Sequence, residues 1–113
     1  MTYTGQNIDM YAGDSKYIDV TTLDADNGGV LDITGCSITY IIYKQSTKNI
    51  VITKTVGSGI TLTDPSNGRF RITLSPSDTQ SMKGIYNHEA ELVDLSSNIS
   101  TLFTGYFKVF SRD

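Results

Sequence analysis

The chain has 113 residues, a formal net charge of −3 and 38% hydrophobic residues, which suits one domain with a modest core. The mild acidity argues against a nucleic-acid-binding face, which needs clustered basic side chains. The single cysteine excludes an internal disulfide, and no apolar run approaches the roughly 18 residues of a membrane span. We therefore expect neither a nucleic-acid partner nor a membrane partner.

The first residues are polar and lack the apolar centre of a secretory signal peptide. We therefore expect synthesis in the cytoplasm without export by the general secretory route. Residues 1–5 are predicted to be a flexible tail, and residues 6–113 are predicted to form a single domain.

Short alternating segments separated by turn signals follow the tail. The predicted strands are Asn7–Tyr11, Lys16–Leu23, Gly35–Tyr43, Ile50–Val56, Ile60–Thr63, Arg69–Leu74, Gly84–Asp94 and Ser100–Phe110. The segment at 64–68 combines Pro with Asn-Gly in turn positions. Short strands at this regular spacing are typical of a β-sandwich or barrel. The chain is therefore expected to be all-β.

Alternation also predicts which side chains point inward, because successive residues of a strand face opposite sides. The inward set includes Phe70, Ile72 and Leu74, then Ile38, Tyr40 and Ile42, then Tyr86, His88, Ala90 and Leu92, and finally Phe103, Phe107 and Val109.

A short helical turn is expected near 76–82, because Ser75 can cap it, Pro76 suits its first position and Asp78 completes a capping box. A glycine and then Tyr86, two residues into a strand, give the layout of a tyrosine corner. Immunoglobulin-type domains carry a cysteine two residues after that tyrosine, where this chain has His88. We predict an immunoglobulin-like β-sandwich of about seven or eight antiparallel strands, held by packing alone.

Candidate chemical groups are few. The loop Asp24–Gly29 resembles a calcium loop, but the twelfth position, which an EF-hand fills with Glu, is Gly35. Glu89 and Glu91 share a strand face at a spacing that overlaps that of inverting glycosidases, although nothing in the sequence builds a cleft around them. We interpret these carboxylates as an acidic loop and a solvated sheet face, and expect no metal and no cofactor.

The only histidine, His88, and the only thiol, Cys36, are interpreted as core residues. Tyr86 and His88 are therefore assigned structural roles. No set of acid, base and nucleophile is visible, so we expect a protein that is not an enzyme.

Apolar side chains on outward positions are the more informative feature. In an immunoglobulin-like topology, the predicted strands Gly35–Tyr43, Gly84–Asp94 and Ser100–Phe110 form one sheet. The outer side of that sheet then carries a candidate protein-interaction face. Its predicted members are Ile41, Tyr43, Ile85, Leu102 and Tyr106. Such a patch marks a partner surface more often than chance, although single exposed apolar residues are common.

The order of these segments resembles a known family. The series runs from Leu31–Tyr40 through Val51–Thr55, Gly59–Thr63, Asn67–Phe70, Leu74–Thr79 and Gly84–Glu89 to Thr101–Val109. It is similar to small immunoglobulin-like domains of bacteriophage tails and baseplates, in particular to the N-terminal domain of phage baseplate upper proteins and to prophage-encoded tail proteins.

The resemblance implies a structural module of a virion that docks on other tail or baseplate proteins or on copies of itself. It carries over no catalytic residue. The chain ends soon after the last expected strand, so the long C-terminal extension of full baseplate upper proteins is not expected. A second class remains open, a module that binds a carbohydrate or another host-surface group through tyrosine rings. Its candidate residues are Tyr11, Tyr17, Tyr43 and Tyr106.

Overall fold

The computed structural model describes residues 6–23 and 29–111, so the predicted tail at 1–5 and most of the acidic loop, 24–28, lie outside the described residues. The strands are β1 (Ile8–Tyr11), β2 (Lys16–Thr21), β3 (Ser37–Lys44), β4 (Ile50–Val56), β5 (Gly59–Asp64), β6 (Arg69–Leu74), β7 (Gly84–Val93) and β8 (Ile99–Phe110). Two helical turns, η1 (Pro65–Asn67) and α1 (Pro76–Thr79), complete the described elements. The predicted strands are confirmed, with ends that differ by one or two residues at most.

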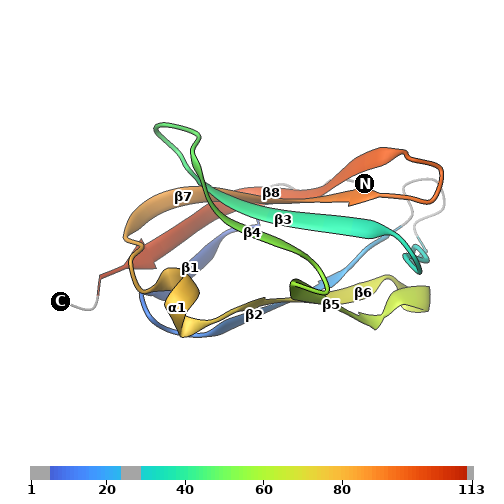
Figure 1. Ribbon diagram of the computed structural model, residues 1–113, viewed down its shortest axis with the longest axis horizontal. Helices are drawn as coiled ribbons and strands as arrows, with labels where there is room; N and C mark the ends of the chain where they lie inside the picture. Colours follow the sequence, from blue (N-terminus) through green and yellow to red (C-terminus); the bar gives the residue numbers. More distant parts are fainter. Residues whose placement is uncertain (1–5, 24–28, 112–113) are drawn as a thin grey trace.

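The strands form one sheet in the order β1-β8-β7-β3-β4-β5-β6-β2, which curls into two facing layers. In Figure 1, β8, β7 and β3 run through the upper layer, β2, β5 and β6 through the lower one, and β4 passes between them. The pairing of β4 with β5 is short, only Thr55 with Gly59 and Val56 with Ile60. The sheet turns from one layer to the other at this short pairing, and β1 and β2 are its two edge strands.

Two of the strand pairings are parallel, whereas the sequence predicted antiparallel strands throughout. β1 runs parallel to β8, and β4 runs parallel to β5. Alternation of side chains is the same beside a parallel or an antiparallel neighbour, so it carries no information on relative strand direction. The direction of β1 is therefore visible only in the tertiary structure.

The core fills the space between the two layers. On β6, Phe70, Ile72 and Leu74 are completely buried, and on β3 the predicted inward residues are buried as well. The predicted inward residues of β7 and β8 are also buried, so alternation identified the core faces of these strands correctly except at Leu102 of β8, which is buried as well. Cys36 is a free, buried thiol, as expected of a core cysteine.

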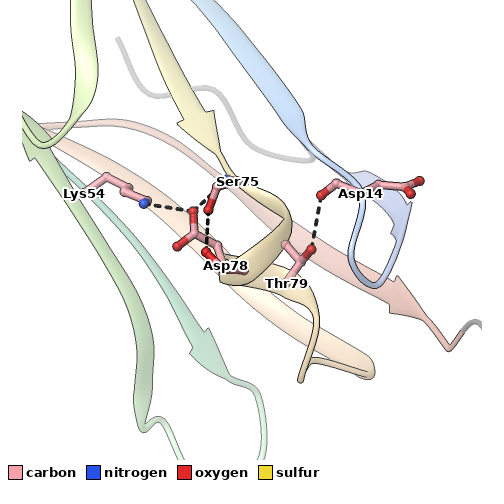
Figure 2. A network of polar contacts seen from close by, with 6 residues as sticks. Asp14, Lys54, Ser75, Asp78 and Thr79 are labelled. Carbon is pink, nitrogen blue, oxygen red and sulfur yellow. Dashed lines mark hydrogen bonds and ion pairs between the residues drawn. The ribbon is translucent and has the colours of Figure 1, made fainter.

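The turn α1 joins β6 of the lower layer to β7 of the upper layer (Figure 1). The capping box is confirmed: the backbone N–H of Ser75 donates to Asp78 Oδ2 at 2.7 Å. Figure 2 shows that the same carboxylate pairs with Lys54 Nζ of β4 at 2.9 Å. On the other side of α1, Thr79 Oγ1 donates to the carbonyl of Asp14 at 3.2 Å. The helical turn is thus attached both to β4 and to the connection between β1 and β2.

Candidate functional site

The outward side chains of β1, β8, β7 and β3 form one continuous surface, here called the outer face. The strand register places Tyr43 of β3, Asn87 of β7 and Tyr106 of β8 in one row across it. Ile41 and Glu89 lie in the neighbouring row on one side. The structure therefore brings four of the five predicted face residues onto one side of the sheet, with Ile85 one row further along β7.

The exposure of these residues varies. Ile85 is 49% exposed and Tyr106 is 52% exposed, whereas Ile41 and Tyr43 are half-buried. The parallel pairing of β1 adds Tyr11 and Phe110 to the same face, beyond the row of Lys108 and Ile85. Tyr11 reaches the outer face only through the pairing of β1 with β8, which the sequence did not predict. Phe110 is outward by the same alternation as Tyr106, but the sequence prediction did not include it.

The predicted outward position of Leu102 is wrong. Leu102 is only 6% exposed, and its neighbour Phe103 is also buried. The register between β7 and β8 shifts at Ala90 and Glu91, which face Phe103 and Thr101. This β-bulge places one extra residue on β8, so two consecutive side chains turn toward the interior. Strict alternation fails at this point, and Leu102 does not belong to the outer face.

A shallow depression of about 330 Å³, here called the outer hollow, lies over the row of Tyr43, Asn87 and Tyr106. It is lined by Asn7, Tyr43, Asn87, Thr104, Gly105 and Tyr106, with a contribution from His88. Asn7 is held at its rim, because its Oδ1 accepts a hydrogen bond from the backbone N–H of Tyr106 at 2.9 Å. No carboxylate, lysine or arginine lines the outer hollow, so its described lining is neutral and polar with two aromatic rings.

Long side chains of the connection after β3 approach the same row. Gln45 Nε2 donates to Asn87 Oδ1 at 3.5 Å, and Lys48 Nζ lies 5.8 Å from the ring centre of Tyr43. The sequence placed Asn87 outward without assigning it a role, and it gave no signal for Asn7. Asn7 reaches the hollow only because the segment before β1 runs alongside β8.

The other two tyrosines of the carbohydrate hypothesis lie elsewhere. Tyr11 packs against Phe110, with ring centres 5.5 Å apart. Tyr17 lies on β2, where the guanidinium of Arg71 is 4.5 Å from its ring centre. Of the four candidate rings, the structure therefore brings only Tyr43 and Tyr106 together.

A larger depression of about 410 Å³ lies beside edge strand β2, and β1 and β8 contribute to its other side. Its lining includes Ile8, Ile18, Val20, Leu102 and Phe103, together with His88. The side chains of the bulge thus face this space rather than the outer face.

His88 lies in the core, where alternation placed it, and is only 1% exposed. Its Nε2 bonds the carbonyl of Gln6 at 2.5 Å, and its Nδ1 bonds the hydroxyl of Tyr40 at 2.8 Å. A carbonyl can only accept, so Nε2 carries the hydrogen and the Tyr40 hydroxyl donates to Nδ1 of the neutral ring. Burial lowers the pKa of His88, and the bond to Gln6 opposes that shift only in part.

Gly105 lies opposite His88 on β8. A Cβ atom at this glycine would collide with the backbone of Gln6. The absence of a side chain therefore lets the segment before β1 approach the sheet closely enough to bond His88. Tyr86 plays the predicted part of a tyrosine corner, because its hydroxyl accepts a hydrogen bond from the backbone N–H of Lys83 at 3.2 Å.

The carboxylate pair has no cleft. Glu91 is exposed, Glu89 is half-buried, and neither lines the outer hollow or the depression beside β2. Within the described residues, no three or more His, Cys, Asp or Glu side chains gather as a metal site. In the same part of the chain, no helix has the length and apolar character needed to cross a membrane.

Comparisons with known proteins identify the fold. No protein-family model and no curated protein matches the chain in sequence. Among solved structures it is similar to CopC from Methylosinus trichosporium OB3b, at 17% identity and a TM-score of 0.52, over 93% of this chain and 85% of that one. It is also similar to fibronectin(III)-like modules of CbhA from Clostridium thermocellum, at 11% identity and a TM-score of 0.51, over 96% and 92%.

The chain has an immunoglobulin-like β-sandwich fold. Fibronectin type III modules share this sandwich architecture, so the predicted fold class is confirmed. Identities this low indicate the fold alone, because sandwiches of this kind serve many unrelated functions.

Proposed function

We propose that this protein is a non-enzymatic structural component of a phage or prophage tail or baseplate, which docks on other tail proteins through its outer face. The phage assignment is supported by the resemblance of the segment series described above. The docking role is supported by one structural observation, the exposed apolar side chains that follow one another across adjacent strands.

These side chains are Tyr11 (54% exposed), Ile85 (49%), Tyr106 (52%) and Phe110 (37%). They come from β1, β7 and β8, which are neighbours in the sheet, so they lie on one surface rather than around the molecule. Lys108 lies between Tyr106 and Phe110 on this surface, with its Nζ 5.0 Å from the ring centre of Phe110. Exposed apolar side chains grouped on one side of a small domain are typical of protein interaction sites, and tyrosine and phenylalanine are enriched there. The proposed location is the virion, after synthesis in the bacterial cytoplasm.

The proposal is tested on particles released by the bacterial strain that encodes the protein. Tails purified on a density gradient after prophage induction are expected to contain this chain in a fixed ratio to the other tail proteins, measured by quantitative mass spectrometry. A chain that is abundant in the lysed cells but missing from the particles would contradict the proposal.

Two charge-introducing variants then test the docking face. Ile85→Glu places a carboxylate in the exposed apolar patch, and incorporation into tails is expected to fall at least tenfold. Leu95→Glu is the matched control, because Leu95 is 79% exposed on the connection between β7 and β8. Equal incorporation of the two variants would rule out this face as the docking surface.

A further inference from the structure

We propose that the outer hollow binds one neutral sugar unit of a carbohydrate, held between the rings of Tyr43 and Tyr106. This inference is independent of the phage assignment, because it depends only on the side chains that line the hollow. The ligand class follows from the geometry of the row, from the hydrogen-bonding groups beside the rings and from the lack of charge.

The two rings flank a polar centre. Tyr43 and Tyr106 lie on β3 and β8, with β7 between them. Their backbones are therefore two strand spacings apart, or about 9–10 Å. Asn87 occupies the position between them. A pyranose ring has an apolar C–H face that packs on an aromatic ring and hydroxyls that need hydrogen-bonding partners at its edge. Two rings around an amide match both requirements.

Hydrogen-bonding groups of both kinds surround the rings. The Oδ1 atoms of Asn7 and Asn87 are engaged by Tyr106 N–H and Gln45, which orients their NH₂ groups as donors. The hydroxyls of Thr104 and the two tyrosines can donate and accept. These neutral groups suit sugar hydroxyls.

The charge of the lining and the volume of the hollow narrow the class of ligand further. No carboxylate, lysine or arginine lines the hollow, and Lys48 approaches it only over the ring of Tyr43, with its Nζ 5.8 Å from the ring centre. The lining itself therefore offers neutral hydrogen-bonding partners, which favour an uncharged ligand. A volume of about 330 Å³ lies at the lower end of the roughly 300–1,000 Å³ of small-molecule sites. The hollow therefore fits one sugar unit better than a long chain, and its shallowness predicts binding in the millimolar range.

A protein partner fits the hollow less well than a sugar. The exposed aliphatic residue of the outer face, Ile85, lies outside the hollow, one row away on β7. The four exposed apolar residues proposed for docking, here called the docking patch (Tyr11, Ile85, Tyr106 and Phe110), thus lie beside the sugar site and share only Tyr106 with it. Variants at Ile85 and at Tyr43 consequently separate the two proposals.

The test is a titration of ¹⁵N-labelled protein with glucose, galactose, mannose, N-acetylglucosamine and their short oligomers, followed by amide chemical shifts. At least one sugar is expected to cause saturable shifts of the amides of Asn87, Thr104, Gly105 and Tyr106. Tyr43→Ala and Tyr106→Ala are each expected to weaken that binding about tenfold, because each removes one stacking ring. Tyr17→Ala, which removes an exposed ring on β2, should leave it unchanged.

The amide spectrum of each variant also reports whether that variant is folded. Tyr106→Ala is the decisive variant, because Tyr106 is exposed and its removal should leave the fold intact. The absence of saturable shifts with all these sugars would overturn the proposal. Binding that survives Tyr106→Ala, or shifts confined to the depression beside β2, would overturn it as well. If the sugars do not bind but Tyr106→Ala lowers incorporation into tails, the row belongs to the protein-docking patch alone.

Discussion

At the scale of single residues, His88 joins three separate segments of the sandwich by hydrogen bonds. It lies where immunoglobulin-type domains carry a cysteine and bonds both Tyr40 of β3 and the backbone of Gln6. The rings of Tyr40, Phe103 and Phe107 pack around it, with centres 5.3 to 5.6 Å from the imidazole. These contacts include no carboxylate that would stabilise a charged imidazolium.

This environment predicts that stability falls as the pH is lowered below about 6.5. Burial lowers the pKa of His88 in the folded state below its ordinary value of 6.5, so the unfolded chain takes up the proton first. The contribution of His88 to the free energy of unfolding is complete above the unfolded pKa, and it is lost as the pH falls from there through the lower pKa of the folded state. The free energy of unfolding, measured with urea between pH 7.5 and pH 5, should fall with decreasing pH by at most about 1.4 kcal/mol per pH unit.

His88→Gln is the control for the pH dependence, because the chain has no other histidine. The variant is expected to be less stable than the wild type but nearly independent of pH over this interval. Aspartates with a lowered pKa, such as Asp78 and Asp94, lose their contribution only at lower pH, near their ordinary value of 3.8 and below. A wild-type protein with constant stability from pH 7.5 to pH 5 would contradict the role given to His88.

At the scale of secondary structure elements, the bulge between β7 and β8 decides what the two strands present to each side. Before the shift Thr101 faces Glu91, and after it Phe103 faces Ala90. Leu102 is the additional residue, and its side chain joins the buried cluster instead of the outer face. One extra residue therefore removes an apolar side chain from the surface and adds it to the core.

We predict that Leu102→Ala destabilises the fold by about 2–5 kcal/mol, as expected for a buried leucine. Leu95→Ala makes the same chemical change at a position that is 79% exposed, so its effect should stay within about 0.5 kcal/mol. Urea unfolding of the two variants measures this difference. Similar small effects at both positions would mean that Leu102 is not packed in the interior.

At the scale of the whole molecule, the turn α1 connects the two layers and is held by polar contacts to both sides. Asp78 bonds Ser75 at the start of α1 and Lys54 on β4, as Figure 2 shows. Thr79 Oγ1 accepts from the backbone N–H of Gly13 at 3.0 Å and donates to the carbonyl of Asp14. These bonds join segments that are distant in sequence at the end of the sandwich where β6 passes into β7.

Asp78→Asn is expected to destabilise the protein by about 1 kcal/mol, a typical cost of weakening a helix cap. Partial burial acts to raise the pKa of Asp78, but the bonds from Ser75 and Lys54 outweigh it and keep the carboxylate charged. Thermal unfolding should show a Tm lowered by about 4 °C.

Asp19→Asn is the matched control for this variant. The Asp19 carboxylate pairs with Arg71 at 2.7 Å, but both side chains are exposed, and exposed ion pairs contribute little to stability. Its Tm should therefore change less than that of Asp78→Asn. Equal shifts would indicate that the attachment of α1 contributes no more than a surface ion pair.

Much of the fold could be predicted from the sequence, because its determinants are local. Alternation predicts the inward residues of β3, β6 and β7, and a local pattern of Ser, Pro and Asp predicts α1 without any long-range contact. The tyrosine corner at Tyr86 is also a local pattern, because its partner Lys83 is three residues away. These features follow from backbone geometry and short-range hydrogen bonds.

The candidate site depended on contacts that no local pattern contains. The parallel direction of β1 and the arrival of Asn7 beside Tyr106 are set by pairing with β8, about 99 residues along the chain. The bulge at Leu102 is set by the register between β7 and β8. A strand's alternation shows which residues share a face, but its neighbours decide which residues of other strands lie beside them. The sequence by itself thus determined the strands and their buried faces, and only the tertiary structure decided that Tyr43, Asn87 and Tyr106 form one row.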